Sequence, residues 1–309
     1  MGAPETVSSD PAGSTAGYKV LSTVPPVVLV IIGTLSIQLG GALAFTIFDD
    51  VGAAGTTLLR LSLSAVLLLA VARPALRGRS ASDWRLVVIF GLILGVMNLC
   101  FYEAISRLPL GVAVTIEFLG PITVAGALSR KPIHWLWVIM AALGVVVLAA
   151  PWTANSTLDR VGVAYALVAA IAWGAYILLA QRLVRRFHAG EGIAIAAVVA
   201  AGLVLIPGLV SGGDRLLDPS LLAVGLGVAL LSSAIPYTTE VEALRRMPAR
   251  VFSVLMSIEP AVAALAGRLV LGQQLPLRDL AAIGLVIVAS AGVMRGADFA
   301  LPAEAAIEA

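Results

Sequence analysis

The sequence has little charge. Only 12% of its 309 residues are Asp, Glu, Lys or Arg, while 60% are hydrophobic and the mean hydropathy is +1.02. A soluble domain carries about 25% charged residues to cover its surface, so the composition argues against a soluble protein. The apolar residues also stand in long blocks rather than in the interrupted stripes of surface helices. The sequence therefore predicts an all-α protein that crosses a lipid bilayer several times.

Cysteine, histidine and lysine are also scarce. The single cysteine, Cys100, excludes a disulfide within the chain. His134 and His188 form no His-Glu-x-x-His pair, and we expect surface roles for both at the cytoplasmic edges. The only lysines, Lys19 and Lys131, lie outside the spans, where neither could hold retinal in mid-helix. We therefore expect no metal, no cofactor and no enzymatic activity, and nothing in the net charge of +2 indicates a nucleic-acid partner.

Long apolar blocks alternate with segments rich in Pro, Gly, Arg and Asp. A helix needs about 20 mostly apolar residues to cross a bilayer. Residues 1–24 lack an apolar run and are predicted to be a disordered tail rather than a signal peptide, and residues 296–309 a second tail. Ten spans are predicted, at about 25–46, 53–72, 86–106, 109–128, 133–151, 161–181, 191–210, 219–240, 249–271 and 277–294.

The basic residues are distributed unevenly between the loops. The two tails and the even-numbered loops hold 14 Lys and Arg residues, the odd-numbered loops hold 5, and Arg60 lies within the second span. Loops on the cytoplasmic side of a membrane are enriched in Lys and Arg. The bias therefore predicts that both termini are cytoplasmic.

The two halves of the chain share a sequence pattern. Residues 103–109 (EAISRLP) and 242–248 (EALRRMP) match at an offset of 139, and the same offset aligns Pro121 with Pro260. If the repeat comprises five helices, the copies at 25–151 and 161–295 must insert in opposite orientations, because five is odd. Inverted repeats are typical of secondary transporters, whose substrate site lies near the bilayer midplane. The pattern therefore predicts a transporter of a small-molecule substrate.

Three ionisable residues lie deep inside the predicted spans, where a charge costs about 2.5–3.5 kcal/mol on insertion scales. Glu117 and Glu259 lie four residues and one residue before the matched prolines. Burial favours the protonated form of a carboxyl group, so either residue could bind a cation or exchange protons, and interhelical hydrogen bonding is the structural alternative. Arg60 could reach towards the membrane surface, pair with a glutamate, or bind a substrate carboxylate through its planar guanidinium.

Polar and aromatic residues inside the spans form a second group of candidates. Asn98 and Tyr102 fall on one face of the third span, and the 139 offset aligns Asn98 with Tyr237. Such side chains could line a substrate cavity or tie helices together, and the sequence leaves both roles open. The group comprises Gln38, Asn98, Tyr102, Trp173, Tyr176 and Tyr237.

Seven segments carry a resemblance to a known family: SIQLGGA (36–42), LRLSL (59–63), MNLCFY (97–102), LPLGVAVTIEFLGPI (108–122), YILLAQR (176–182), SSAIPY (232–237) and LMSIEPAVAALAG (255–267). Over about residues 25–295 the sequence resembles the EamA-type branch of the drug/metabolite transporter superfamily, and within it most of all the exporters of threonine and homoserine. The resemblance implies ten helices in two inverted repeats, a location in the inner or plasma membrane, and proton-driven export of small amino acids or related metabolites. Many members carry Trp-Gly in the first helix and a Lys near its end, where this chain has Gln38 and Phe45.

The leading hypothesis is an amino-acid exporter driven by proton antiport, in which Glu117 or Glu259 binds the ammonium group and Arg60 the carboxylate. The second is an exporter of drugs or quaternary-ammonium cations, although aromatic residues, which would surround such a cation, make up only 6% of the chain. A facilitator without proton coupling and a non-transporting receptor or scaffold are further alternatives. The sequence is compatible with a homodimer.

Overall fold

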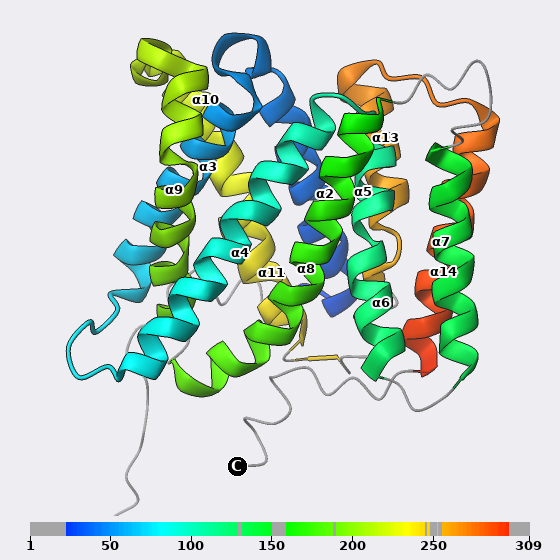
Figure 1. The fold of residues 1–309 in the computed structure, drawn as a ribbon, viewed down its shortest axis with the longest axis horizontal. Coiled ribbons are helices and arrows are strands. Elements are labelled where there is room, and N and C mark those ends of the chain that lie inside the picture. Colours follow the sequence, from blue (N-terminus) through cyan, green and yellow to red (C-terminus); the bar gives the residue numbers. More distant parts are fainter. Residues whose placement is uncertain are drawn as a thin grey trace, which may run out of the picture.

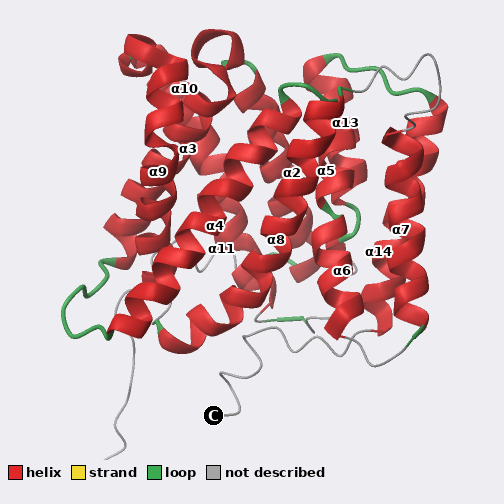
Figure 2. Cartoon of the chain, viewed as in Figure 1, coloured by secondary structure: helices red, strands yellow, loops and turns green. Residues whose placement is uncertain are grey.

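The fold was analysed in a computed structural model, which describes residues 23–128, 132–149, 159–187, 190–244, 246–247, 252 and 255–296. All regular structure in these ranges is helical (Figures 1 and 2). The tails predicted at 1–24 and 296–309 lie almost entirely outside them. The elements are α2 (Pro26–Phe45), α3 (Phe48–Ala72), α4 (Ala81–Ile105), α5 (Leu110–Glu117), α6 (Leu119–Leu128), α7 (Ile133–Ala149), α8 (Arg160–Arg186), α9 (Glu191–Gly212), η1 (Gly213–Leu217), α10 (Pro219–Ala229), η2 (Leu230–Ala234), α11 (Ile235–Leu244), α13 (Glu259–Leu271) and α14 (Leu277–Gly296).

Eight helical segments in the described ranges are long and apolar enough to cross a membrane. They correspond to the predicted first to fourth, sixth to eighth and tenth spans. The predicted fifth span is α7, which has 17 residues. The predicted ninth span contains α13, which has 13 residues, while residues 249–251 and 253–254 of that span lie outside the described ranges. The prediction of an all-helical, multi-pass membrane protein is confirmed.

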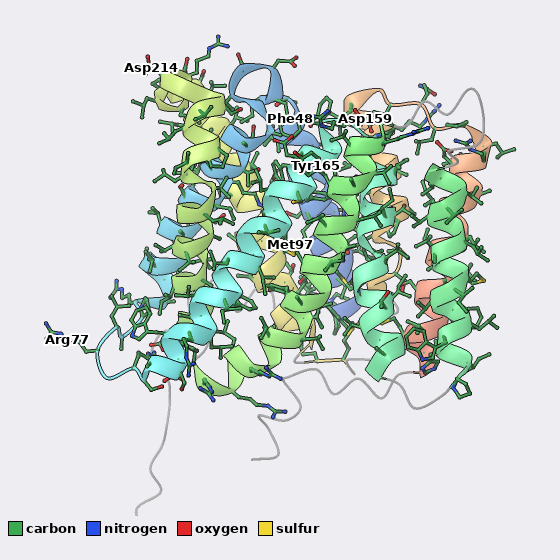
Figure 3. All side chains as sticks on the ribbon, in the orientation of Figure 1. Phe48, Arg77, Met97, Asp159, Tyr165 and Asp214 are labelled. Carbon is green, nitrogen blue, oxygen red and sulfur yellow. The ribbon has the colours of Figure 1, made fainter. Side chains whose placement is uncertain are left out.

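The helices run between two faces, which are the upper and lower faces in Figure 1. In that view α3, α9 and α10 stand on one side, α7 and α14 stand on the other, and α4 and α8 pass in front of α2 and α11. The main helix pairs are α3 with α9, α4 with α8, α2 with α11, α5 with α13 and α7 with α14. The start of α2 and the end of α14 lie at the lower face. Figure 3 shows Arg77 at this same face and Asp159 and Asp214 at the upper face.

Polar caps determine where two of the long helices begin. Ser80 and Asp83 form a reciprocal capping box at the start of α4. At the start of α8, the Asp159 carboxylate accepts hydrogen bonds from the N–H groups of Val161 (2.7 Å) and Gly162 (3.1 Å). These bonds, chiefly the one from Gly162, lower the pKa of Asp159 from its ordinary value. A carboxylate at the upper face therefore stabilises the first turn of α8.

Small residues allow some helices to approach closely. A Cβ atom added at Gly120 would lie 2.1 Å from the carbonyl oxygen of Ala170, so the α6 backbone lies directly against α8. A Cβ at Gly111 would lie 2.6 Å from the Cα of Ala264, which joins α5 to α13 in the same way. Close contacts through small residues are the usual way in which helices pack inside a membrane.

Regular helix is interrupted at each of the two glutamates that the sequence predicts to be functional. α5 ends at Glu117, Phe118 forms a turn, and α6 begins at the next residue. Because Pro121 has no N–H, the carbonyl group of Glu117 lacks its partner four residues later. α13 begins at Glu259, with Pro260 at its second position. Both glutamates therefore lie where regular helix gives way to a turn.

The expected surface position of His134 is wrong, and two helices continue past the predicted span ends. α8 continues to Arg186 and α11 to Leu244. The apolar segments of these helices that are long enough to cross a membrane end at Ala180 and Glu240, which agrees with the predicted spans 161–181 and 219–240. Charged residues mark these span ends, and long charged side chains that reach the membrane surface allow a helix to continue beyond it. His134 is only 2% exposed, because α6 packs against the first turn of α7 near Gly126. His188 lies outside the described ranges.

Candidate substrate and proton site

Arg60, on α3, is held by two other elements. Its Nη1 donates a hydrogen bond to the hydroxyl oxygen of Tyr102 on α4 (3.3 Å), and its Nη2 donates one to the carbonyl oxygen of Ser232 in η2 (3.3 Å). The guanidinium carbon lies 5.4 Å from the centre of the Tyr102 ring, within the range of a cation–π contact. The Nε atom is buried and has no hydrogen-bond partner among the described residues. Arg60 therefore has a donor left for a further acceptor.

The carbonyl oxygen of Ser232 is available because of the local backbone. Leu230–Ala234 form a turn of π-helix, a form that is frequent at functional sites. Pro236 lacks the N–H that would otherwise bond to this carbonyl four residues earlier. Ser36 on α2 donates a hydrogen bond to the neighbouring carbonyl of Leu231 (2.7 Å). The irregular turn thus exposes carbonyl groups that α2 and α3 bind.

Glu117 on α5 and Glu259 on α13 are both buried, with 9% and 4% of their surface exposed. Neither carboxyl group forms a hydrogen bond or an ion pair with any residue in the described ranges. The positive charge of Arg60 acts on Glu117, and Glu117 in turn acts electrostatically on Glu259. The fold therefore brings all three deep charges of the sequence into one electrostatic group.

A fourth ionisable residue, which the sequence did not predict, belongs to this group. Glu240 lies on α11, its charge acts on Glu259, and its Oε1 atom is buried without a hydrogen-bond partner among the described residues. The predicted eighth span ended at this residue, and the residue was not among the predicted site residues. An acid four residues after Pro236 within an apolar block was the signal that could have identified it.

The second group of candidates divides between two regions. Tyr102 is fully buried and binds Arg60, and the Trp173 ring packs edge-on against Phe118, the residue after Glu117, at 5.1 Å between centroids. Tyr176 instead packs against Phe90 in a separate apolar cluster (4.8 Å).

Asn98 and Gln38 are buried. The Asn98 amide donates a hydrogen bond to the Leu94 carbonyl of its own helix (2.8 Å), and Figure 3 shows its neighbour Met97 near the middle of α4. Gln38 lies on α2, the helix that contacts both α11 and α13. Tyr237 lies on α11, but its side chain is outside the described part of the structure.

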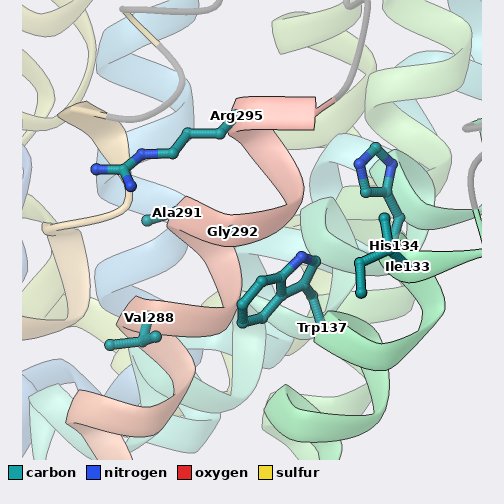
Figure 4. Close-up of a pocket in the computed structure, with 7 residues that line it drawn as sticks. All are labelled: Ile133, His134, Trp137, Val288, Ala291, Gly292 and Arg295. Atoms are coloured by element: carbon teal, nitrogen blue, oxygen red, sulfur yellow. The ribbon is translucent and has the colours of Figure 1, made fainter.

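A pocket of about 500 Å³ lies elsewhere, between α7 and α14 (Figure 4). His134, Trp137 and Arg295 are among its lining residues, and in Figure 4 the Arg295 guanidinium extends away from the Trp137 ring. None of the deep charged residues lines this pocket, so it takes no part in the site built around Arg60.

Helices that cross a membrane, with buried acidic and basic side chains between them, define a multi-pass membrane protein with a polar interior site. The model of the EamA-like transporter family matches residues 160–295. The threonine/homoserine exporter RhtA of Escherichia coli K12 is 42% identical over 269 residues, which covers 86% of this chain and 90% of that protein. RhtA of Salmonella typhimurium LT2 is 42% identical over 268 residues, with the same coverage.

A crystal structure of another protein has a TM-score of 0.55 to this chain at 20% identity, and covers 86% of this chain and 96% of that one. This likeness supports the fold alone. The long matches to the two exporters also show the family: the chain belongs to the EamA-like transporter family. It is a membrane transporter rather than an enzyme.

Proposed function

We propose that the protein exports threonine, homoserine and related small amino acids from the cytoplasm in exchange for protons. The observation that carries this proposal is the 42% identity to threonine/homoserine exporters over 86% of the chain. The buried charges fit such a substrate, because an amino acid carries a carboxylate and an ammonium group that must both be matched away from water.

Arg60 is suited to the substrate carboxylate. Two of its nitrogen atoms are already bound by the protein, and these contacts orient the guanidinium, while the free Nε donor can reach a further oxygen. Glu117 is suited to the ammonium group, because it is buried, lies within the electrostatic range of Arg60 and forms no ion pair in the described structure. A zwitterion between them would satisfy both side chains.

An inverted repeat would explain how this site faces each side of the membrane in turn. In an inverted repeat, α2 of the first half would correspond to α8 of the second, and α4 would correspond to α11. The pair α4–α8 would then correspond to the pair α11–α2, and both pairs pack extensively. The pairs α3–α9, α5–α13 and α7–α14 map onto themselves under the same correspondence. The packing pattern is therefore the one expected for two five-helix halves, 25–151 and 161–295, around a midplane cavity.

The coupling to protons is proposed from the buried carboxyl groups. A carboxyl without a counter-charge is more stable protonated when water is absent, and it can release its proton when water or a cation enters. Exchange of a proton for the substrate ammonium at Glu117 or Glu259 would link the two fluxes. Both termini and the Arg77 face would then be cytoplasmic, as the distribution of basic residues predicts.

Export from loaded cells tests this proposal. Cells that produce the protein and are loaded with a panel of amino acids should release threonine and homoserine faster than cells without it. Glu117→Gln and Arg60→Ala should each slow this release by about tenfold or more, since a hydrogen bond to a charged group contributes about 1.5–3 kcal/mol. If both variants, at equal amounts in the membrane, export at the wild-type rate, the assigned roles are wrong. Selective release of quaternary-ammonium cations would favour the drug-exporter alternative.

A further inference from the structure

Glu240 occupies a setting that differs from that of its neighbour on α11. Glu242, two residues later, forms an ion pair with Arg246 (3.2 Å). Glu240 instead packs against α2 at Gly33, where an added Cβ would lie 3.4 Å from its Cγ and 3.5 Å from its Oε1. α2 carries no ionisable side chain, so the element that covers Glu240 supplies no counter-charge. The two acids of α11 therefore differ in that Glu242 is neutralised by a basic partner, whereas Glu240 has none among the residues that the structure describes.

The three carboxyl groups are spread across the thickness of the protein, with Glu117 and Glu259 buried and Glu240 half-buried. Glu240 lies four residues before the lower end of α11, or about 6 Å at 1.5 Å per residue. Glu259 lies twelve residues before the upper end of α13, about 18 Å below it. Glu117 lies seven residues after the upper start of α5, about 10 Å below that end.

The packing of the helices follows the same order, since α13 with Glu259 packs against α5 with Glu117, and α2 packs against both α13 and α11. Glu259 interacts with Glu240 on one side and with Glu117 on the other, and Glu117 interacts with Arg60. Glu117 and Glu259 are more than nine-tenths buried and have no hydrogen-bond partner in the described ranges, and the Oε1 atom of Glu240 is likewise buried and unpaired. Protein groups thus leave these acceptor atoms free for a proton or a water molecule.

We propose that Glu240 is the cytoplasmic port of a three-carboxyl proton path, Glu117 to Glu259 to Glu240. This inference rests on the proposed proton antiport. A proton from the upper side binds the Glu117 carboxylate. Its O–H bond then breaks as a new O–H bond forms on Glu259, directly or through water, and the same exchange carries the proton to Glu240. Glu240 finally releases it to water at the lower face, and each carboxylate is restored for the next proton.

Purified protein in proteoliposomes can separate this role from substrate binding. One assay measures exchange of labelled for unlabelled threonine at equal pH on both sides, and the other measures threonine accumulation driven by a pH gradient. Glu240→Gln should keep exchange within about twofold of wild type and lose at least about tenfold of the gradient-driven accumulation, because the amide cannot carry a proton. Glu240→Asp should recover part of the loss. Glu103→Gln, at the upper end of α4 and outside the path, should match wild type in both assays.

The outcomes distinguish this inference from the function on which it rests. If the wild-type protein accumulates threonine with the gradient and Glu240→Gln does so equally well, the port is wrong while proton antiport stands. If Glu240→Gln loses both activities to the same degree, Glu240 acts in folding or substrate binding, and the port is again wrong. If wild-type protein exchanges threonine but ignores the gradient, proton antiport itself fails.

Discussion

Arg60 is bound by Tyr102 and Ser232 and still has an unpaired Nε atom. A planar guanidinium can hold these two partners and present a third donor to a carboxylate, whereas a lysine ammonium is a single flexible point charge. The side chain is therefore suited to its position by its shape as well as by its charge.

Arg60→Lys tests the importance of that shape. The substitution keeps the positive charge and removes the fork, so we expect the KM for threonine to rise about tenfold or more, in line with the loss of a charge-assisted hydrogen bond. Arg215→Lys is the matched control, because Arg215 forms an exposed ion pair with Asp50 (2.7 Å) that contributes little. Equal KM values for the two variants in vesicle uptake would contradict the role of Arg60.

Residues of this site were recognisable in the sequence to different degrees. Glu117, Glu259 and Arg60 stand out because a charge inside an apolar run needs an explanation. Glu240 did not, because the burial of its Oε1 atom depends on α2, whose Gly33 is distant in the sequence and contacts Glu240 only in the folded chain. The burial of His134 has a similar origin, since α6 covers it. The electrostatic grouping of Arg60 with the three glutamates likewise follows from tertiary packing.

At the scale of the elements, the apolar blocks predicted the positions of the helices well, but not all of the irregular turns within them. Hydrophobic length located the spans, because crossing a bilayer requires it. The turn at Phe118 could be anticipated from Pro121, which deprives the preceding turn of a hydrogen bond. The π-helical turn at Leu230–Ala234 could not, because it depends on Ser36 and Arg60 binding its carbonyl groups from other helices.

The close contact of α6 with α8 gives a second prediction. In Gly120→Ala the new Cβ would lie 2.1 Å from the Ala170 carbonyl oxygen, a backbone atom that cannot rotate away. We expect a loss of about 1–3 kcal/mol of stability, which is typical of overpacking, and a lower thermal transition in detergent. Gly202→Ala on α9 is the control, since nothing lies within 4 Å of its added Cβ. Equal melting temperatures for these two variants would show that α6 and α8 are not so closely packed.

At the scale of the whole molecule, the orientation of the two faces follows from the same account. The lower face holds Arg77, and the upper face holds Asp159 and Asp214 (Figure 3). The excess of basic residues in the lower loops and tails predicts that the lower face is cytoplasmic. The start of α2 and the end of α14 share this face, as an even number of crossings requires.

Cysteine labelling tests this orientation. In a Cys100→Ala background, Asp214→Cys should react with a membrane-impermeant maleimide on intact cells, and Arg77→Cys should react only after permeabilisation. Both positions are exposed, so a failure to react reports the membrane barrier rather than burial. The reverse pattern would place the termini outside the cell and would contradict the proposed direction of the proton path.

Proton movement during substrate efflux tests the central claim most directly. In vesicles loaded with threonine and a pH-sensitive dye, wild-type protein should acidify the lumen as threonine leaves, because each amino acid is exchanged for protons. Glu259→Gln should abolish the acidification. Threonine efflux from wild-type vesicles with no change in lumenal pH would show a facilitator, and would contradict the account of buried carboxyl groups as proton carriers.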